Sequence, residues 1–264
     1  MPASELDAIA LDHAQIMRAA GMRADPWQAR VLRRRYQRLI LNIARQVGKS
    51  TVIACWALIE MLYYAPALVL VLGPSERQSK ELIRTVDKVR KTLGVAVDPE
   101  RQSTTSMEFL TGSRIVALPS KEANIRGLAA VKLLVLDEAS RIPDDVYNAV
   151  KPMLAVSQGR VALLSTPFGK RGFFHKEWTE GESWERIKVT AYECSRYDAA
   201  ALELEKRSIP DSWFRQEYLC EFADNDSSMF RYEDVEAAMS DEVLPLFGLP
   251  QQTSVTDSVR PLFQ

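Results

Sequence analysis

The stretch Arg45-Gln46-Val47-Gly48-Lys49-Ser50-Thr51 has the residue types of a phosphate-binding loop. An apolar run at 39–43 precedes it, and a segment of helical character from Val52 to Tyr63 follows it. In a tight turn between a strand and a helix, backbone N–H groups and the positive end of the helix can surround a polyphosphate. Lys49 would then reach the β- and γ-phosphates, and the Ser50 hydroxyl would bind Mg²⁺. The loop therefore predicts a nucleoside triphosphate site.

A second signal is required, because the general phosphate-loop pattern has glycine where this chain has Ile43. That signal is the segment 131–138, an apolar run that ends in Asp137 and Glu138. Such a run is typical of a buried parallel strand, and ligands of open α/β sheets bind at the C-terminal edge of the strands. Asp137 would hold Mg²⁺, and Glu138 would orient and activate the attacking water. The alternative is a strand followed by a solvated acidic turn.

Two weaker motifs fit the same site. Ser165-Thr166-Pro167 ends an apolar strand, where its hydroxyls would sense the γ-phosphate; the alternative is an ordinary strand-terminating turn. Gln28, next to Trp27 and upstream of the first strand, has an amide that can hydrogen-bond an adenine edge. Its alternative is a surface helix with one aromatic side chain packed on the core.

Arginines supply the positive charge that stabilises a transferring phosphoryl group. Arg45 would act within its own loop, whereas Arg126, followed by a glycine, would act across a subunit interface. Arg141, after the acidic strand, is interpreted as a solvated surface charge. The densest basic run is 30–38, which would contact a phosphate backbone or form a solvated face.

Strand-like and helix-like segments alternate, which predicts an α/β fold with a mostly parallel sheet and helices on both faces. The expected strands are 39–43, 68–72, 132–136, 161–165 and 186–190, with a hairpin of 107–110 and 114–118. The expected helices are 4–22, 27–36, 51–63, 76–93, 144–153, 199–208 and 212–221. We expect an ATPase-type core with N-terminal helices over 1–169, a small helical lid subdomain over 170–226, and a linker or mobile tail over 227–264.

The composition is that of an ordinary globular protein and argues against a polycation, a zinc protein and a membrane protein. The 264 residues are 47% hydrophobic and 26% charged, with a formal net charge of -1, so any nucleic-acid contact needs a local basic patch. Cys55, Cys194 and Cys220 lack metal-ligand spacing, which argues against a zinc site and for free thiols in a reducing compartment. No apolar run reaches about 18 residues, and the start is not a signal peptide, so we expect a soluble cytoplasmic protein without a membrane partner.

In this order, Arg45-Gln46-Val47-Gly48-Lys49-Ser50, Asp137-Glu138-Ala139-Ser140 and Ser165-Thr166-Pro167-Phe168-Gly169 resemble the ATPase domain of bacteriophage terminase large subunits. These subunits are the motors that package double-stranded DNA into proheads. The segment from Phe214 to Phe222 is similar to the one that closes this domain. The resemblance covers most of the chain, from Pro26 to Phe222, and implies a P-loop NTPase fold of the additional-strand, RecA-like class.

The resemblance also implies roles for single residues. Lys49 and Ser50 would bind phosphate and Mg²⁺, Arg45 would be the loop arginine, and Asp137 would coordinate Mg²⁺. Glu138 would be the catalytic carboxylate, and Gln28 would read the adenine. Ser165-Thr166-Pro167 would be the coupling motif, and Arg126 would be a trans-acting arginine finger. The implied cofactors are ATP and Mg²⁺. The implied partners are double-stranded DNA, a portal protein and a small terminase subunit. The active form would be a ring of identical subunits in the host cytoplasm, transiently at the prohead portal, and the isolated chain a monomer.

Terminase large subunits usually continue into an RNase H-like nuclease, and this chain departs from that pattern. Only a few dozen residues follow Phe230, and the acids among them lie in a segment without expected strands: Asp234, Glu236, Asp241 and Glu242. We therefore expect no nuclease activity in this chain, which is either an isolated ATPase piece or a motor whose nuclease is a separate chain. The alternatives are a helicase-like nucleic-acid translocase, which needs a second motor domain, and a non-catalytic assembly subunit that binds ATP to order a ring.

Overall fold

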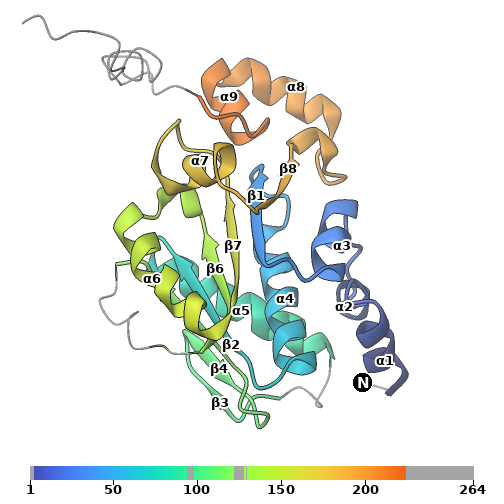
Figure 1. The fold of residues 1–264 in the computed structure, drawn as a ribbon. Helices are drawn as coiled ribbons and strands as arrows, with labels where there is room; N and C mark the ends of the chain where they lie inside the picture. Colours follow the sequence, from blue (N-terminus) through green and yellow to red (C-terminus); the bar gives the residue numbers. More distant parts are fainter. Residues whose placement is uncertain (1–2, 94–97, 122–127, 129, 224–264) are drawn as a thin grey trace, which may run out of the picture. The chain divides into compact units, whose positions relative to one another are not determined.

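The computed structural model describes residues 3–93, 98–121, 128 and 130–223. Within these ranges an eight-stranded sheet has the order β3-β4-β5-β2-β6-β7-β1-β8 (Figure 1). The strands are β1 Arg38–Ile43, β2 Leu68–Gly73, β3 Arg101–Gln102, β4 Ser106–Glu108, β5 Arg114–Pro119, β6 Val131–Asp137, β7 Arg160–Ser165 and β8 Glu185–Val189. The α-helices are α1 Ala3–Leu11, α2 Gln15–Ala19, α3 Pro26–Arg33, α4 Lys49–Tyr63, α5 Glu76–Leu93, α6 Asp144–Ser157, α7 Gly172–Thr179, α8 Ala199–Ser208 and α9 Asp211–Glu217.

The sheet is mostly parallel, as the alternation of elements predicts. Strands β5, β2, β6, β7, β1 and β8 pair in parallel, and only β3, β4 and β5 form antiparallel pairs. The predicted hairpin is therefore confirmed as β4 and β5, and β3 extends it at the edge of the sheet. Because β1, β6 and β7 are neighbours and parallel, the segments that follow them leave the same edge of the sheet.

Two hydrophobic clusters fill the two faces of the sheet. Along β6, Leu133 and Val135 belong to one cluster, whereas Leu134 and Leu136 belong to the other. This alternation is the period of two that a strand imposes on its side chains. Helices α1 to α5 contribute to the first cluster, and α6 and α7 contribute to the second (Figure 1). The prediction of helices on both faces is thus confirmed.

Several helix boundaries differ from the sequence prediction for local reasons. The helix expected over 4–22 is divided into α1 and α2, because the Asp12 carboxylate accepts the N–H of Ala14 and two bonds from Arg33. Helix α4 begins at Lys49, directly after Gly48 in a left-handed conformation. The helix expected over 212–221 ends at Glu217. Beyond it the chain turns back, and the Cys220 carbonyl accepts the buried amide of a β1 side chain.

The segment after Gly169 contributes to the main sheet as well as to helices. The predicted strand near Arg186 is confirmed as β8, which pairs with β1 through Leu39 and Glu185. Helices α8 and α9, orange in Figure 1, follow β8. The division into a core ending at residue 169 and a lid from residue 170 stays a prediction. The tail expected over 227–264 lies outside the described residues.

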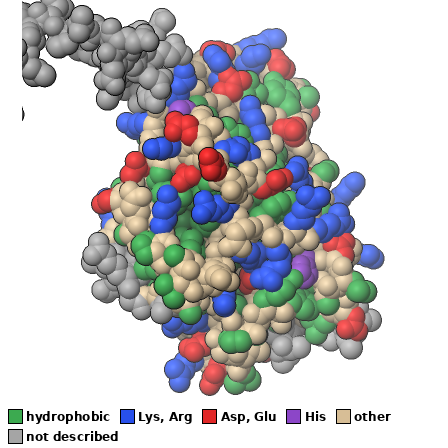
Figure 2. Space-filling view, in the orientation of Figure 1, with side chains coloured by type: hydrophobic (Ala, Val, Ile, Leu, Met, Phe, Trp, Pro, Cys, Tyr) green, Lys and Arg blue, Asp and Glu red, His purple; other side chains and the backbone are tan. Residues whose placement is uncertain are grey.

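The surface drawn in Figure 2 carries charges of both signs, and the cysteines are buried. On the face drawn in Figure 2, basic and acidic side chains are interspersed and not segregated by sign. All three cysteines are buried free thiols, and burial raises the pKa of Cys55 and of Cys220 to about 12. Among the described residues, no helix is both long and apolar enough to cross a bilayer.

Candidate functional site

The loop between β1 and α4 brings the predicted phosphate-binding residues to the C-terminal edge of the sheet. Gln46 and Gly48 both have positive φ, at 55° and 90°, so the backbone turns sharply before the helix begins at Lys49. A Cβ at position 48 would lie 2.7 Å from Nε2 of Gln28 and 2.8 Å from Nη1 of Arg196. Position 48 therefore favours glycine chiefly for its φ, and any larger residue would also displace the ends of these two side chains.

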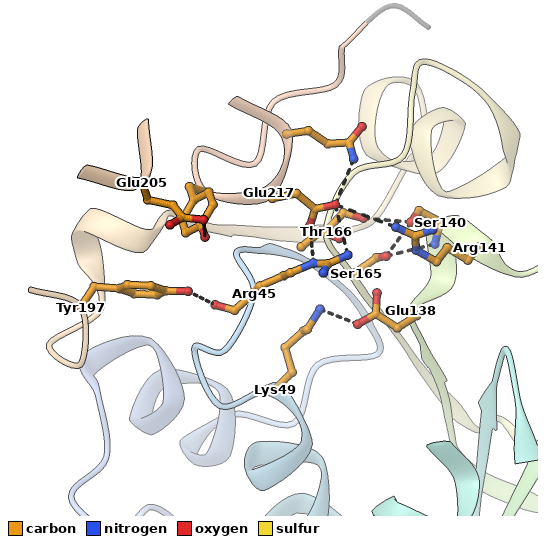
Figure 3. A network of polar contacts seen from close by, with 12 residues as sticks. Arg45, Lys49, Glu138, Ser140, Arg141, Ser165, Thr166, Tyr197, Glu205 and Glu217 are labelled. Carbon is orange, nitrogen blue, oxygen red and sulfur yellow. Dashed lines mark hydrogen bonds and ion pairs between the residues drawn. The ribbon is translucent and has the colours of Figure 1, made fainter. Parts of the chain in front are cut away.

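Lys49 and the acids that follow β6 meet at this edge. The Lys49 ammonium donates a 2.8 Å hydrogen bond to Oε1 of Glu138 (Figure 3). Lys49 lies in the first turn of α4, and Glu138 follows β6, which is separated from β1 by β7 in the sheet. Burial, with the neighbouring Glu138 carboxylate, raises the pKa of Asp137 to about 6, and the Lys49 charge opposes that rise. A buried carboxylate with a raised pKa is one whose negative charge is incompletely compensated. This is the setting in which a bound cation would be stabilised.

The turn after β7 is hydrogen-bonded to the turn after β6. The Ser140 and Ser165 hydroxyl oxygens lie 2.7 Å apart, and the Ser140 hydroxyl donates to the Thr166 carbonyl at 2.9 Å. Ser165 and Thr166 are both buried. These contacts fix the strand-terminating turn to the short helical turn Ala139–Arg141 that follows the acids (Figure 3). A shift at Glu138 would therefore be transmitted to the end of β7.

Arg45 extends from the loop towards α9 and pairs with Glu217. Its Nε donates a 2.6 Å bond to Oε2 of Glu217, and Nη2 donates a 3.4 Å bond to Oε1 (Figure 3). The Glu217 side chain is 6% exposed, whereas the Arg45 side chain is 57% exposed. Nη2 of Arg141 lies 3.8 Å from the same carboxylate, so Arg141 is an ion-pair partner and not merely a solvated charge.

The strand β8 and the segment after it supply contacts to the loop that the sequence does not predict. Arg196 donates to the Asp25 carboxylate at 2.8 Å and also to the Val47 carbonyl. The Tyr197 hydroxyl donates to the Arg45 carbonyl at 2.8 Å. No motif marks these residues, because their role depends on β8 lying beside β1. The only available signal was the expected strand near Arg186, whose place in the sheet cannot be predicted from one sequence.

The remaining predicted residues lie around the loop, except one. The Gln28 amide is 1% exposed: Oε1 accepts the Asp25 N–H at 2.8 Å in a capping box, and Nε2 donates to the Val47 carbonyl at 3.5 Å. Gln28 thus ties α3 to the loop. Ser50 and Thr51 lie in the first turn of α4, exposed and half-buried respectively. Arg126 lies outside the described residues.

The donor set fits a magnesium-bound polyphosphate. The loop offers backbone N–H groups at the start of a 15-residue helix, and Lys49 offers a nearly buried ammonium. The Ser50 hydroxyl and the Asp137 carboxylate are oxygen ligands of the kind that Mg²⁺ prefers. Chemically, the arrangement can bind a polyphosphate and present the Glu138 carboxylate to its outer end.

Comparison with known proteins identifies the family to which most of the chain belongs. A family model described as "Terminase large subunit, T4likevirus-type, N-terminal" matches residues 40–237. A curated terminase large subunit from Thermus phage G20c is 27% identical over 231 residues, covering 74% of this chain and 47% of that protein. The chain therefore spans about half the length of the curated relatives that it matches.

Solved structures show the same fold. The large terminase ATPase domain of Thermus phage P74-26 superposes with a TM-score of 0.68 at 21% identity, covering 78% of this chain and 97% of that one. A large terminase from a thermophilic bacteriophage, solved in complex with ATP-γ-S, superposes with a TM-score of 0.58 at 14% identity. That match covers 71% of this chain and 48% of the other. The predicted P-loop fold is thus confirmed.

Proposed function

Because the chain belongs to the terminase large subunit family, matching its T4likevirus-type N-terminal model, we propose that it hydrolyses ATP to drive double-stranded DNA into a prohead. The observation that carries this proposal is the meeting of Lys49 with Glu138 beside the half-buried carboxylate of Asp137. These residues come from two segments far apart in the chain, and the sequence of each segment predicts a part of the same nucleoside triphosphate site. A relative solved with ATP-γ-S supports the choice of nucleotide.

The Lys49–Glu138 bond suggests an order of events at the site. Phosphate oxygens at the loop would compete with Glu138 for the Lys49 ammonium, whose side chain is 9% exposed. Once Lys49 turns to the phosphates, Oε1 of Glu138 is free to accept a proton from water. Glu138, 23% exposed, is accessible to that water. Lys49 would therefore bind the nucleotide and release the general base in the same movement.

Other residues of the chain would orient the nucleotide. Ser50 and Asp137 would hold Mg²⁺, which when bound neutralises phosphate charge during in-line displacement. Arg45 would leave Glu217 for a phosphate oxygen. Gln28 would face the base only if its amide gave up the Asp25 and Val47 bonds, so we assign it chiefly to holding the loop.

Coupling to movement would pass through two contacts. The Ser140–Ser165 bond links Glu138 to the end of β7, and the Arg45–Glu217 pair links the loop to α9. Loss of the γ-phosphate would change both. We further propose contacts to the DNA backbone in a ring of subunits, with a portal protein, a small terminase subunit and a separate nuclease as partners. A trans-acting Arg126 is part of this proposal, as are a lid formed by 170–226 and an active location at the prohead in the host cytoplasm.

The test measures nucleotide affinity and ATP turnover separately in Glu138→Gln. We expect affinity within a few-fold of the unmodified chain, and turnover lower by about 10²- to 10⁴-fold, the usual contribution of a general base. Glu221→Gln, which removes an exposed carboxylate paired with Arg215, is the matched control and should retain turnover. Near-normal hydrolysis by Glu138→Gln would refute the assignment.

Two further measurements separate the proposed motor from a subunit that only binds ATP. Turnover is followed at rising protein concentration, because an arginine acting in trans makes activity depend on association. It is followed again with DNA present. Tight ATP binding without hydrolysis under all these conditions would favour the non-catalytic assembly subunit.

A further inference from the structure

A polar cavity lies at the opposite edge of the sheet from the loop. Its volume is about 560 Å³, within the range of small-ligand sites, and it is lined by residues from the end of α4 and from the starts of β6 and β7. Arg160 is the first residue of β7, whereas Ser165 at the nucleotide site is the last. At about 3.3 Å per residue, the two sites are separated by roughly 17 Å along this strand.

The lining of this cavity carries uncompensated positive charge. Among the described residues that line it, the basic ones are Arg35, Lys132 and Arg160, and the one acid is Glu60. The Glu60 carboxylate is shared: Oε2 accepts Nη2 of Arg35 at 3.3 Å, and Oε1 pairs with Nη2 of Arg160. Lys132 is exposed and has no acidic partner in the part of the chain that the structure describes. The described lining therefore has a formal charge of +2.

Arg160 provides a second and independent observation. Its side chain is 7% exposed, yet Nε, Nη1 and Nη2 have no hydrogen-bond acceptor among the described residues, although Nη2 forms the ion pair with Glu60 and the guanidinium carbon lies 5.5 Å from the centroid of the Trp56 ring. Buried guanidinium donors without acceptors are unusual, because desolvation of an unpaired donor is unfavourable. Burial lowers the pKa of Arg160, the Glu60 charge opposes this, and the Arg35 charge adds to it. An anion in the cavity would compensate the charge that Glu60 leaves.

Arg35 is placed to complete such a site. Its guanidinium stacks on the Tyr64 ring at 3.6 Å from the centroid, which holds the planar group in one orientation. The sequence marked Arg35 only as part of the basic run 30–38. The structure divides that run, because Arg30 pairs with Glu185 and Arg33 pairs with Asp12. Of these arginines, Arg35 is the one that lines the cavity.

We propose that this cavity is a binding site for a phosphate group, held by Arg35 and Lys132 at its mouth and by the charge of Arg160 behind them. Guanidinium and ammonium groups together are the usual protein partners of phosphate. The phosphate can come from free inorganic phosphate or from a DNA backbone. Only the DNA source rests on the proposed function.

The first arm of the test uses inorganic phosphate. Binding to the full chain is followed by titration calorimetry in chloride buffer, in a Lys49→Ala background that weakens phosphate binding at the loop. We expect Lys132→Gln and Arg35→Gln each to weaken binding by about tenfold, the effect of one charge-assisted contact. Arg84→Gln, an exposed arginine of α5 outside the cavity, removes the same charge and should leave the affinity unchanged.

The second arm uses a short DNA duplex of mixed sequence and no nucleotide. Fluorescence anisotropy gives the affinity over a series of salt concentrations. If the cavity holds a backbone phosphate, Lys132→Gln should make the slope of log K against log salt shallower by about 0.9. Because neither arm requires hydrolysis, failure of the ATPase proposal leaves both readable, and failure here leaves the ATPase proposal standing.

A loss in either arm that is specific to the cavity variants supports the site and identifies its source of phosphate. Arg160 is not substituted, because its removal would leave Glu60 buried with less compensation and would threaten folding. Urea unfolding midpoints confirm that the two surface variants remain folded. If neither ligand binds, or if the cavity variants bind like Arg84→Gln, the cavity holds only water and the proposal is overturned.

Discussion

Glu217→Gln removes the charge that holds Arg45 while keeping the shape of the side chain. The carboxylate accepts two bonds from Arg45 and one from Gln216 at 3.1 Å. Bonds to charged groups contribute about 1.5–3 kcal/mol, but Arg45 is 57% exposed and solvent screens much of the attraction. The amide also retains an acceptor. We therefore expect a loss of about 1 kcal/mol in the free energy of unfolding, or roughly 2–4 °C in Tm.

The reverse substitution should be more harmful. Arg45→Ala leaves the Glu217 carboxylate, only 6% exposed, with the more distant Arg141 at 3.8 Å. A buried charge that loses its partner is destabilising by more than an exposed one. We expect Arg45→Ala to lose about 2 kcal/mol, more than Glu217→Gln.

The two substitutions should change the affinity for ATP in opposite directions. If Arg45 must leave Glu217 to reach a phosphate, then removing the competing carboxylate strengthens ATP binding by as much as the pair contributes, about 1 kcal/mol or fivefold. Arg45→Ala should weaken ATP binding instead. The affinities are measured by titration with a fluorescent ATP analogue, and stability by urea unfolding, with Glu221→Gln as the control on the same segment. Unchanged or weaker ATP binding by a folded Glu217→Gln protein would refute this account of Arg45.

Gly48→Ala should weaken ATP binding at least tenfold and destabilise the chain by about 1–2 kcal/mol, because φ is 90° and the new Cβ would meet Nε2 of Gln28; equal affinity would contradict the loop geometry. Ser140→Ala should lower stability by about 1–2 kcal/mol in urea unfolding and reduce turnover more than ATP affinity; an unchanged midpoint would contradict a structural bond at that turn. Asp12→Asn should lose about 1 kcal/mol at pH 7. Arg33 lowers the pKa of Asp12 from 3.8 to about 2, so the stabilisation is present above pH 4 and lost as the pH falls towards 2; a deficit constant in urea unfolding at pH 7, 5 and 3 would exclude the charge as its cause.

The parts of the site that the sequence predicted are those with a local pattern. The loop before α4, the acids after β6 and the hydroxyls after β7 each follow an apolar strand, and parallel strands place their ends at one edge. The Lys49–Glu138 bond follows from that rule once β1 and β6 are recognised as strands. The family resemblance rests on the same residues, and the matching family model confirms it.

The parts that escaped prediction depend on which distant segments meet. Glu217 and Arg196 are ordinary charged residues in sequence, and they reach the loop because β8 lies beside β1. The amide of Gln28 predicts a contact to an adenine edge, but a capping box at the start of α3 already uses its oxygen. The break between α1 and α2 depends on Arg33 binding Asp12, a contact that helical periodicity does not encode.

The position of β1 between β7 and β8 has a consequence for how the chain folds during synthesis. Leu39 pairs with Ala162 on one side and Glu185 on the other, so both neighbours of β1 leave the ribosome long after it does. Until then, an almost entirely buried apolar strand has no partner on either edge, and pairings between residues so distant in sequence form slowly. The strand that carries the loop is thus among the last to be enclosed. During this interval we expect aggregation through the unpaired edges of β1 to compete with folding.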